Sequence, residues 1–165
     1  MYIFGGYNQD LDLFFSNVFR FDVETLEWTC LYNLESEWCS RNFLSSVLIK
    51  NNIYLFGGQE TKSNKHDNRV FCLNLDSMNW SIASAKGTIP CGRRSHCAFV
   101  HNNKMIIYGG YNKLIDKYFN DFYSFDPETQ KWTEILVQGL PTDSHRKRPS
   151  GCVVNDRLFI FGGSW

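Results

Sequence analysis

The sequence predicts an all-β protein with one antiparallel sheet per repeat, and three observations point to this class. Gly-Gly pairs recur, with first glycines 52, 52 and 53 residues apart. A tryptophan follows each of the first three pairs at a constant offset of 23 residues. Aromatic residues make up 16% of the 165 residues and charged residues 21%, a composition that can bury a core. The repeated residues are Gly5, Gly6, Gly57, Gly58, Gly109, Gly110, Gly162 and Gly163, with Trp28, Trp80 and Trp132.

Each repeat contains four segments with the pattern of a strand. Short apolar runs end at each Gly-Gly, at residues 1–4, 53–56, 105–108 and 158–161, and predict strands covered on both faces. Before the last three of these runs lies another strand, at residues 43–49, 96–100 and 150–154. After each Gly-Gly, apolar residues alternate at 19 and 21, 71 and 73, and 123 and 125, and a tryptophan strand follows. Four strands per repeat of this length indicate a β-propeller.

The turn between the last two strands of each repeat has its own signature. Residues 22–25, 74–77 and 126–129 each begin with Asp or Asn, whose side chain can accept hydrogen bonds from the backbone that follows. We therefore expect a tight turn at each of these places.

The repeats divide the chain into blades. We expect a blade lacking its first strand at 1–34, blades at 35–86 and 87–139, and the first two strands of a further blade at 140–165. Closed propellers have roughly four to eight blades. These 165 residues hold about three, so we expect an incomplete propeller, a fragment of a larger ring.

The sequence resembles the kelch family. The resemblance rests on the apolar strand ending in Gly-Gly, on Asn120 and Asp121 ahead of the turn at 126–129, on the tryptophans, and on Gly-Arg-Arg-Ser-His at 92–96. It is closest to a kelch group of substrate receptors for cullin-RING ubiquitin ligases. This implies a six-bladed ring and a non-enzymatic module that binds the C-terminal tails of proteins, with the ligase adaptor bound through a region absent here. The alternative is a kelch scaffold that binds cytoskeletal or chromatin proteins.

Composition and motifs exclude several classes of function. Lys plus Arg and Asp plus Glu are both 17, so no net charge attracts nucleic acid. No apolar run is long enough to cross a membrane, and no secretory signal is present, so we expect a cytoplasmic or nuclear protein with reduced cysteines. The four histidines lie apart without metal-ligand spacing, and no nucleotide-binding or nucleophile motif occurs. We therefore expect no metal, no cofactor and no catalysis.

Two classes of loop are candidates for binding. One class follows Gly-Gly, and the other leads into the first strand of each blade. Arg41, Arg93 and Arg146 recur in the second class, 52 and 53 residues apart, which predicts a structural role on neighbouring carbonyls or aromatic rings. The neighbouring cations, Arg94, Lys147 and Arg148, remain available for a ligand. The three repeated tryptophans are expected in the core, and Trp38 is either a loop anchor or an exposed contact.

The resemblance implies a pocket that holds a free C-terminal carboxylate with arginines and a small hydroxyl. By position, Tyr7, Arg94 and Ser95 fit such a pocket, whereas Gln59 and Lys62 stand where relatives have arginines. Carboxylate binding is then either weakened or rebuilt from Lys62, Lys65 and Arg94. The candidate ligand-binding residues are Tyr7, Gln59, Lys62, Arg93, Arg94 and Ser95.

Overall fold

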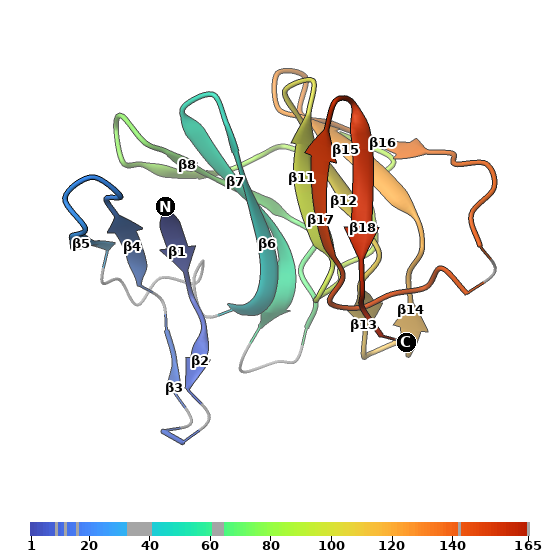
Figure 1. Ribbon diagram of the computed structural model, residues 1–165, viewed down its shortest axis with the longest axis horizontal. Coiled ribbons are helices and arrows are strands. Elements are labelled where there is room, and N and C mark those ends of the chain that lie inside the picture. The colour runs from blue at the N-terminus through green and yellow to red at the C-terminus, as the bar shows by residue number, and fades with distance from the viewer. Residues whose placement is uncertain are drawn as a thin grey trace.

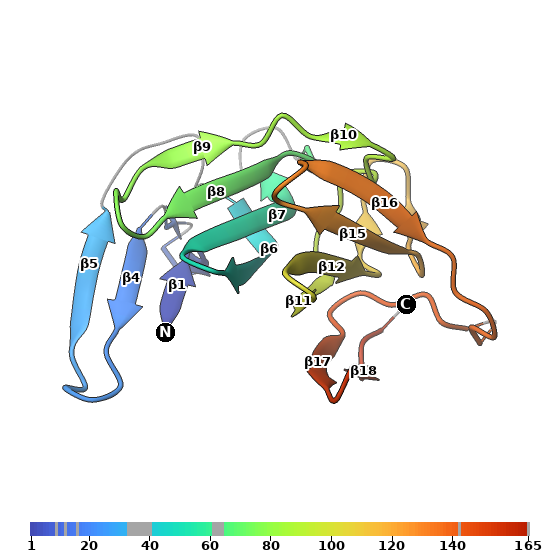
Figure 2. The same ribbon diagram turned by 90° about the horizontal axis from the view of Figure 1, so that it is seen from above.

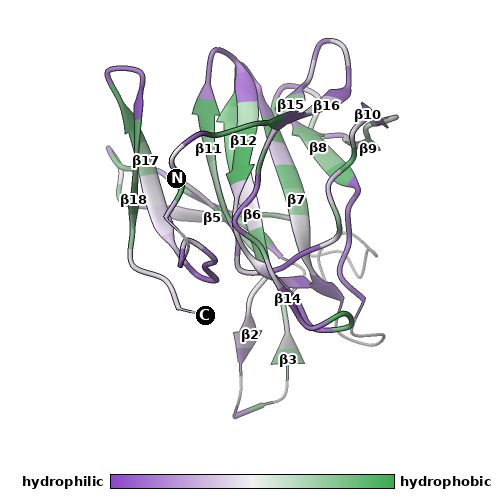
Figure 3. Ribbon diagram, turned by 90° about the vertical axis from the view of Figure 1, so that its right-hand side faces the viewer, coloured by the Kyte–Doolittle hydropathy of each residue, from purple (hydrophilic) through white to green (hydrophobic). Residues whose placement is uncertain are grey.

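The computed structural model describes residues 1–8, 10–11, 13–15, 17–32, 41–60, 65–141 and 143–164, and every regular element in these ranges is a strand. Successive blades stand side by side in an arc that does not close, with the first strand of each blade toward the concave side (Figures 1 and 2). Apolar residues follow the strands, and hydrophilic residues gather at the turns (Figure 3). The predicted all-β class and incomplete propeller are confirmed. The candidates Lys62 and Trp38 lie outside the described residues.

The first blade consists of three strands in the order β1 (Tyr2–Phe4), β4 (Val18–Phe21) and β5 (Trp28–Tyr32). The segment after its Gly-Gly is a small hairpin of β2 (Tyr7–Asn8) and β3 (Leu13–Phe14). The sequence predicts a loop here, so the hairpin is an addition to the predicted blade.

The second blade has all four strands, in the order β6 (Arg41–Ile49), β7 (Asn52–Glu60), β8 (Val70–Asn74) and β9 (Trp80–Ile82). Strand β7 continues through its Gly-Gly, whereas the sequence predicted that it ends at residue 56. It is longer because β6 begins earlier than predicted and keeps pairing with it as far as Arg41 opposite Glu60.

The third blade is formed by β11 (Cys97–His101), β12 (Lys104–Tyr108), β15 (Phe122–Asp126) and β16 (Lys131–Ile135). A fifth strand, β10 (Lys86–Gly87), pairs in parallel with the outer edge of β16. It belongs to the segment that leads from the second blade to the third, so it ties one blade to the next. No hydrophobic pattern marks these two residues, and the sequence did not predict them as a strand.

The last pair of strands, β17 (Ser150–Val154) and β18 (Arg157–Phe161), begins a fourth blade beside β11. After the third Gly-Gly, β13 (Tyr111–Asn112) and β14 (Lys117–Tyr118) form a hairpin like the one in the first blade. Figure 1 shows both hairpins projecting from the same end of the blades. The loops at this end carry most of the candidate residues.

The predicted turns are confirmed by their hydrogen bonds. The Oδ1 atom of Asp22 accepts from the backbone amides two and three residues later, at 2.9 and 3.2 Å. Asn74 does the same at 3.2 and 2.8 Å, and Asp126 at 3.0 and 3.3 Å. The side chain thus replaces a backbone acceptor and fixes each turn.

The hydrophobic cores lie between blades. Between the first two blades, Val18 packs with residues of β7 and β8 such as Leu55 and Leu73. The second core joins the second and third blades, and its largest buried side chain is Trp132, which is fully buried. The third joins the third blade to β17 and β18. Each blade is therefore stabilised mainly by its neighbours, as in other repeat proteins.

The three tryptophans differ in burial because only Trp80 and Trp132 pack on the preceding blade. Trp132 meets Phe56, with ring centroids 5.0 Å apart, and Trp80 meets Phe4 at 6.1 Å. Each of these phenylalanines stands directly before a Gly-Gly. Trp28 contacts Phe21 of its own blade at 4.8 Å and is 51% exposed. The expected core position therefore fails for Trp28, because the described residues place no blade against that face.

Candidate functional site

The Gly-Gly pairs hold the loop that leads into the next blade. The amide of Gly58 donates to the carbonyl of Arg93 at 2.9 Å, and the amide of Gly110 donates to the carbonyl of Arg146 at 2.7 Å. Gly57 has φ +71°, and a Cβ added to it would lie 2.5 Å from the carbonyl oxygen of Arg93. Glycine is required there by both the backbone conformation and the close approach. The repeat thus fixes the position of the arginine loops.

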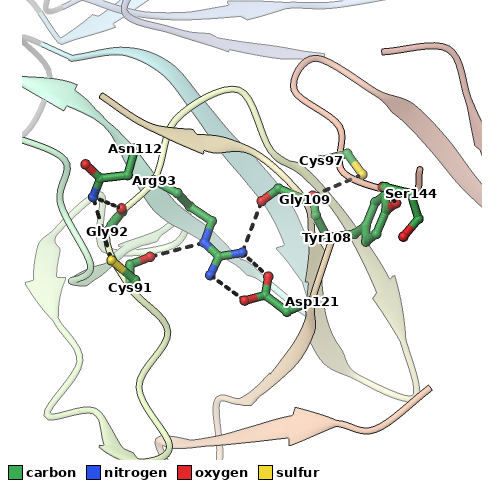
Figure 4. Close-up of polar contacts among 9 residues, drawn as sticks. All are labelled: Cys91, Gly92, Arg93, Cys97, Tyr108, Gly109, Asn112, Asp121 and Ser144. Atoms are coloured by element: carbon green, nitrogen blue, oxygen red, sulfur yellow. Dashed lines mark hydrogen bonds and ion pairs between the residues drawn. The ribbon is translucent and has the colours of Figure 1, made fainter. Parts of the chain in front are cut away.

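Arg93 is a buried structural residue (Figure 4). Its side chain is fully buried, and its guanidinium bonds both carboxylate oxygens of Asp121, with Nη2 to Oδ2 at 3.1 Å. It also donates to the carbonyls of Gly109 at 3.0 Å and Cys91 at 3.1 Å, and it stacks on Phe119 at 3.8 Å. Arg93 therefore cannot contact a ligand, which corrects its place among the candidate ligand residues. These contacts are the carbonyl and aromatic contacts expected of the repeated arginine.

Arg41 has the equivalent surroundings in the second blade. It forms a salt bridge with Asp67 and lies over the ring of Phe71, 4.6 Å from its centroid. Burial opposes ionisation of Asp67, but hydrogen bonds from Arg69 and the charge of Arg41 outweigh it and lower the pKa of that carboxyl. Both buried arginines are thus neutralised by an aspartate.

Arg94 is half-buried and has a neutral partner. Its Nη1 donates to the amide oxygen of Gln59, and its guanidinium lies over Phe43 and Tyr111, 5.5 and 5.7 Å from their centroids. Within the described part of the chain, no carboxylate forms an ion pair with Arg94. None of the described residues therefore pairs its positive charge with a carboxylate.

The positive charge around Arg94 is also felt by a nearby histidine. Burial is the main cause that lowers the pKa of His66, and the charges of Arg94 and Lys113 lower it further. His66 is bridged to Gln59 through the backbone. Arg94 and Lys113 thus both place positive charge beside His66.

Gln59 orients Arg94 and offers little surface of its own. It lies on β7 opposite Asn42 and is 9% exposed. An amide oxygen can hold one N–H of a guanidinium while leaving the other donors of that group free. Gln59 is therefore positioned to orient Arg94, and its own side chain is too buried to contact a ligand directly.

Ser95 belongs to a set of three residues with the same left-handed backbone. Phe43, Ser95 and Arg148 have φ angles of 58°, 56° and 57°, one in each of three successive blades. The amide of Ser95 donates to the carbonyl of Phe43 at 2.8 Å, and the amide of Arg148 donates to the carbonyl of Ser95 at 2.6 Å. The backbone of these loops therefore forms a hydrogen-bonded chain from blade to blade, and Ser95 is its middle link.

Tyr7 is 42% exposed on β2, in the first blade. The tyrosine that contacts Arg94 is instead Tyr111, which stands at the same place after the third Gly-Gly. Tyr111 directly follows a Gly-Gly and Phe43 begins a predicted strand, and neither was among the candidate ligand-binding residues. The fixed offset of Tyr7 and Tyr111 from Gly-Gly was the signal that could have selected Tyr111.

Cations and aromatic rings alternate in the loops that lead into the first strand of each blade and in the hairpin after the third Gly-Gly. We call this group the rim cluster. Its members come from the second, third and fourth blades and are Phe43, Arg94, Tyr111, Tyr118, Lys147 and Arg148. In the described ranges no group of three or more His, Cys, Asp or Glu side chains could hold a metal ion. The rim cluster brings three cations and three aromatic rings together, and we take it as the candidate binding site.

Comparison with known proteins agrees with the geometry. Residues 1–163 match the family profile described as the KLHDC2/KLHL20/DRC7 Kelch-repeats domain. Human kelch domain-containing protein 3 is 32% identical over 99% of this chain and 44% of its own length. Tip elongation aberrant protein 1 of Schizosaccharomyces pombe is 30% identical over 99% of this chain and 15% of its own length. Acyl-CoA-binding domain-containing protein 4 of Arabidopsis thaliana is 31% identical over 87% of this chain and 21% of its own length.

The chain thus spans less than half the length of these relatives. The repeated Gly-Gly, the buried arginine–aspartate pairs and the profile match over nearly every residue all lead to one conclusion. This chain belongs to the kelch-repeat family, whose β-propellers typically serve as protein-interaction modules.

Proposed function

We propose that this chain forms the recognition surface of a substrate receptor for a cullin-RING ubiquitin ligase, and that Arg94 binds the free C-terminal carboxylate of a protein tail. Membership of the kelch family and similarity to kelch domain-containing protein 3 support the receptor role. The adaptor of the ligase binds through a region outside these residues.

The observation that carries the proposal is the neutral partner of Arg94. The buried arginines Arg41 and Arg93 each pair with an aspartate, whereas Arg94 is held by the amide of Gln59. A guanidinium without a carboxylate partner keeps its full charge and several free donors. Its planar fork matches the two oxygens of a carboxylate.

The surroundings of Arg94 strengthen this interaction. The guanidinium of Arg94 lies over the rings of Phe43 and Tyr111, which reduce its contact with water. Hydrogen bonds to charged groups contribute roughly 1.5–3 kcal/mol each, more than neutral ones. Ordering of Arg94 by Gln59 before binding reduces the entropy lost when the ligand binds.

A pair of peptides tests the proposal with the intact protein. A peptide ending in a free glycine should bind at least about tenfold more tightly than its amidated twin, since one charge-assisted interaction is lost on amidation. Fluorescence anisotropy measures both affinities. Equal affinities would rule out recognition of the carboxylate.

Two substitutions assign the effect to Arg94. Arg94→Ala should bring the free peptide down to the affinity of the amide. Gln59→Glu should do the same while keeping Arg94, because the new carboxylate would neutralise it. Lys86→Ala removes an exposed charge on β10, and should leave binding unchanged.

The receptor role has a separate test in cells. The intact protein should co-purify with a cullin-RING adaptor, and Arg94→Ala should retain the adaptor while failing to shorten the lifetime of a tail substrate. If the intact protein binds the peptide normally but shortens the lifetime of no tail substrate, only the ligase role is contradicted.

A further inference from the structure

The rim cluster holds more positive charge than one terminal carboxylate can neutralise. Arg148 lies over Phe43 at 5.2 Å, on the ring that Arg94 also contacts. Lys147 lies over Tyr111 at 5.7 Å and over Tyr118 at 5.2 Å. Three cations therefore alternate with three aromatic rings across three blades.

The backbone holds these side chains in fixed places. Arg94 and Tyr111 exchange two backbone hydrogen bonds, of 3.0 and 2.9 Å, and Lys147 exchanges two with Ser164, of 2.8 and 3.0 Å. The chain of hydrogen bonds from Phe43 through Ser95 to Arg148 joins the blades. The spacing of the three cations is thus set by the fold and not by flexible loops.

The cations of the rim cluster, Arg94, Lys147 and Arg148, have no ion-pair partner among the described residues. One carboxylate contacts an aromatic member of the cluster, because Asp116 accepts a hydrogen bond from the Tyr111 hydroxyl at 2.8 Å. Lys113 and Lys117 of the same hairpin add further positive charge. The surface is therefore complementary to an anion with several charges.

We propose that the rim cluster selects protein tails that carry acidic side chains one to three residues before the C-terminal carboxylate. This inference rests on the proposed function, because it places the terminal carboxylate at Arg94. An extended peptide advances about 3.3 Å per residue, so a side chain one to three residues upstream comes within reach of Lys147 or Arg148. Neutral tails leave these cations unpaired, and basic tails are repelled.

The rim cluster suits an acidic peptide better than a single-stranded nucleic acid. Proteins bind single-stranded nucleic acids by letting the bases stack on exposed aromatic rings. Here cations already lie over Phe43, Tyr111 and Tyr118, and the two tyrosine rings lie 4.5 Å apart. A base could stack on these rings only by displacing the charged ends of the cations, whereas an acidic side chain can pair with those charges directly.

Four peptides test the inference on the intact protein. Two end in a free glycine and differ only in Asp or Asn at the second and third positions from the end, and the other two are their amidated twins. The Asp peptide should bind about tenfold more tightly than the Asn peptide at low salt, and the preference should weaken as salt rises. Equal affinity of the Asp and Asn free acids would overturn the inference.

The two proposals fail in different ways. If free acids and amides bind equally but Asp is still preferred to Asn, the carboxylate site at Arg94 is wrong and acidic recognition stands. If free acids are preferred and Asp equals Asn, only the acidic preference is wrong. The double variant Lys147→Ala, Arg148→Ala should abolish the Asp preference and keep the preference for the free acid.

A matched control and a competitor complete the test. Lys86→Ala with Lys131→Ala removes two charges from the β10–β16 edge and should leave the Asp preference intact. Single-stranded oligo(U) should bind more weakly than the Asp peptide. Tighter binding of oligo(U), lost in the Lys147, Arg148 double variant, would overturn the inference in favour of a nucleic acid.

Discussion

Arg93 and Arg94 are adjacent in the sequence and have opposite surroundings. Arg93 is fully buried, paired with Asp121 and stacked on Phe119. Arg94 is half-buried and held by the neutral amide of Gln59. One arginine holds the blade together, whereas the other presents its charge at the surface.

The repeat explains the difference. The position of Arg93 is also arginine in the neighbouring repeats, at Arg41 and Arg146, while the position of Arg94 is Asn42 and Lys147. The position that is the same in each blade makes the contacts of the fold. The position that changes from blade to blade lies at the surface, where a change of side chain alters binding without altering the blade.

The largest expected effect is on stability, from Arg93→Ala. Removing this guanidinium leaves Asp121 and the Gly109 carbonyl without their partner and opens space beside Phe119. Loss of one partner of a buried ion pair costs about 3–5 kcal/mol. Urea unfolding of the intact protein measures the change.

Arg94→Ala is the matched control for that prediction. It removes the same side chain from the next residue and leaves a buried neutral amide, so its cost should stay near 1 kcal/mol. Similar losses for the two variants would show that Arg94 also supports the fold and would weaken its assignment to binding.

The sequence allowed part of this comparison to be predicted. Arginines 52 and 53 residues apart predicted a structural role for Arg93, and that periodicity proved a better guide than its inclusion among ligand candidates. The partner of Arg94 could not be predicted, because Gln59 lies on another blade, 35 residues away. Phe43 was missed because nothing in a phenylalanine predicts a positive φ, which normally favours glycine.

Tryptophan burial shows the same limit. The constant offset from Gly-Gly predicted one position in each blade for Trp28, Trp80 and Trp132. Trp132 is fully buried and Trp28 is 51% exposed, because Trp80 and Trp132 pack on the blade before their own whereas Trp28 contacts only its own blade among the described residues. The spacing of the sequence repeats determines the place of a residue within a blade, and the neighbouring blades determine how far its side chain is buried.

A buried histidine beside the two arginines makes the stability of the fold depend on pH. His96, in the same loop as the two arginines, is buried beside Phe56, and its Nε2 is hydrogen-bonded to the Ser45 hydroxyl. Burial, with a smaller contribution from the charge of Arg93, lowers its pKa to about 3. The unfolded chain takes up a proton near pH 6.5, whereas the folded protein stays neutral until about pH 3.

The contribution of neutral His96 to the free energy of unfolding is fully present above pH 6.5. It decreases as the pH falls toward 3, by on the order of 1 kcal/mol per pH unit. Urea unfolding between pH 7 and pH 4 should show a shallower loss in His96→Gln than in the unmodified protein. His101→Gln, at a more exposed site, is the control, and equal slopes for all three proteins would exclude His96 as the source.

The smallest expected effect concerns the backbone that supports the rim cluster. Ser95 has φ 56°, a conformation that costs a residue with a Cβ roughly 1–2 kcal/mol, whereas glycine adopts it freely. Ser95→Gly relieves that cost but increases the entropy of the unfolded chain, so the net gain in stability should be below about 1 kcal/mol. Ser46→Gly, in the extended part of β6, has no strain to relieve and should lose stability. Opposite signs for two identical substitutions would show that the left-handed position, and not the serine, holds the rim in place. Unchanged peptide affinity in Ser95→Gly would further show that its hydroxyl takes no part in binding, leaving the charge of Arg94 to hold the carboxylate.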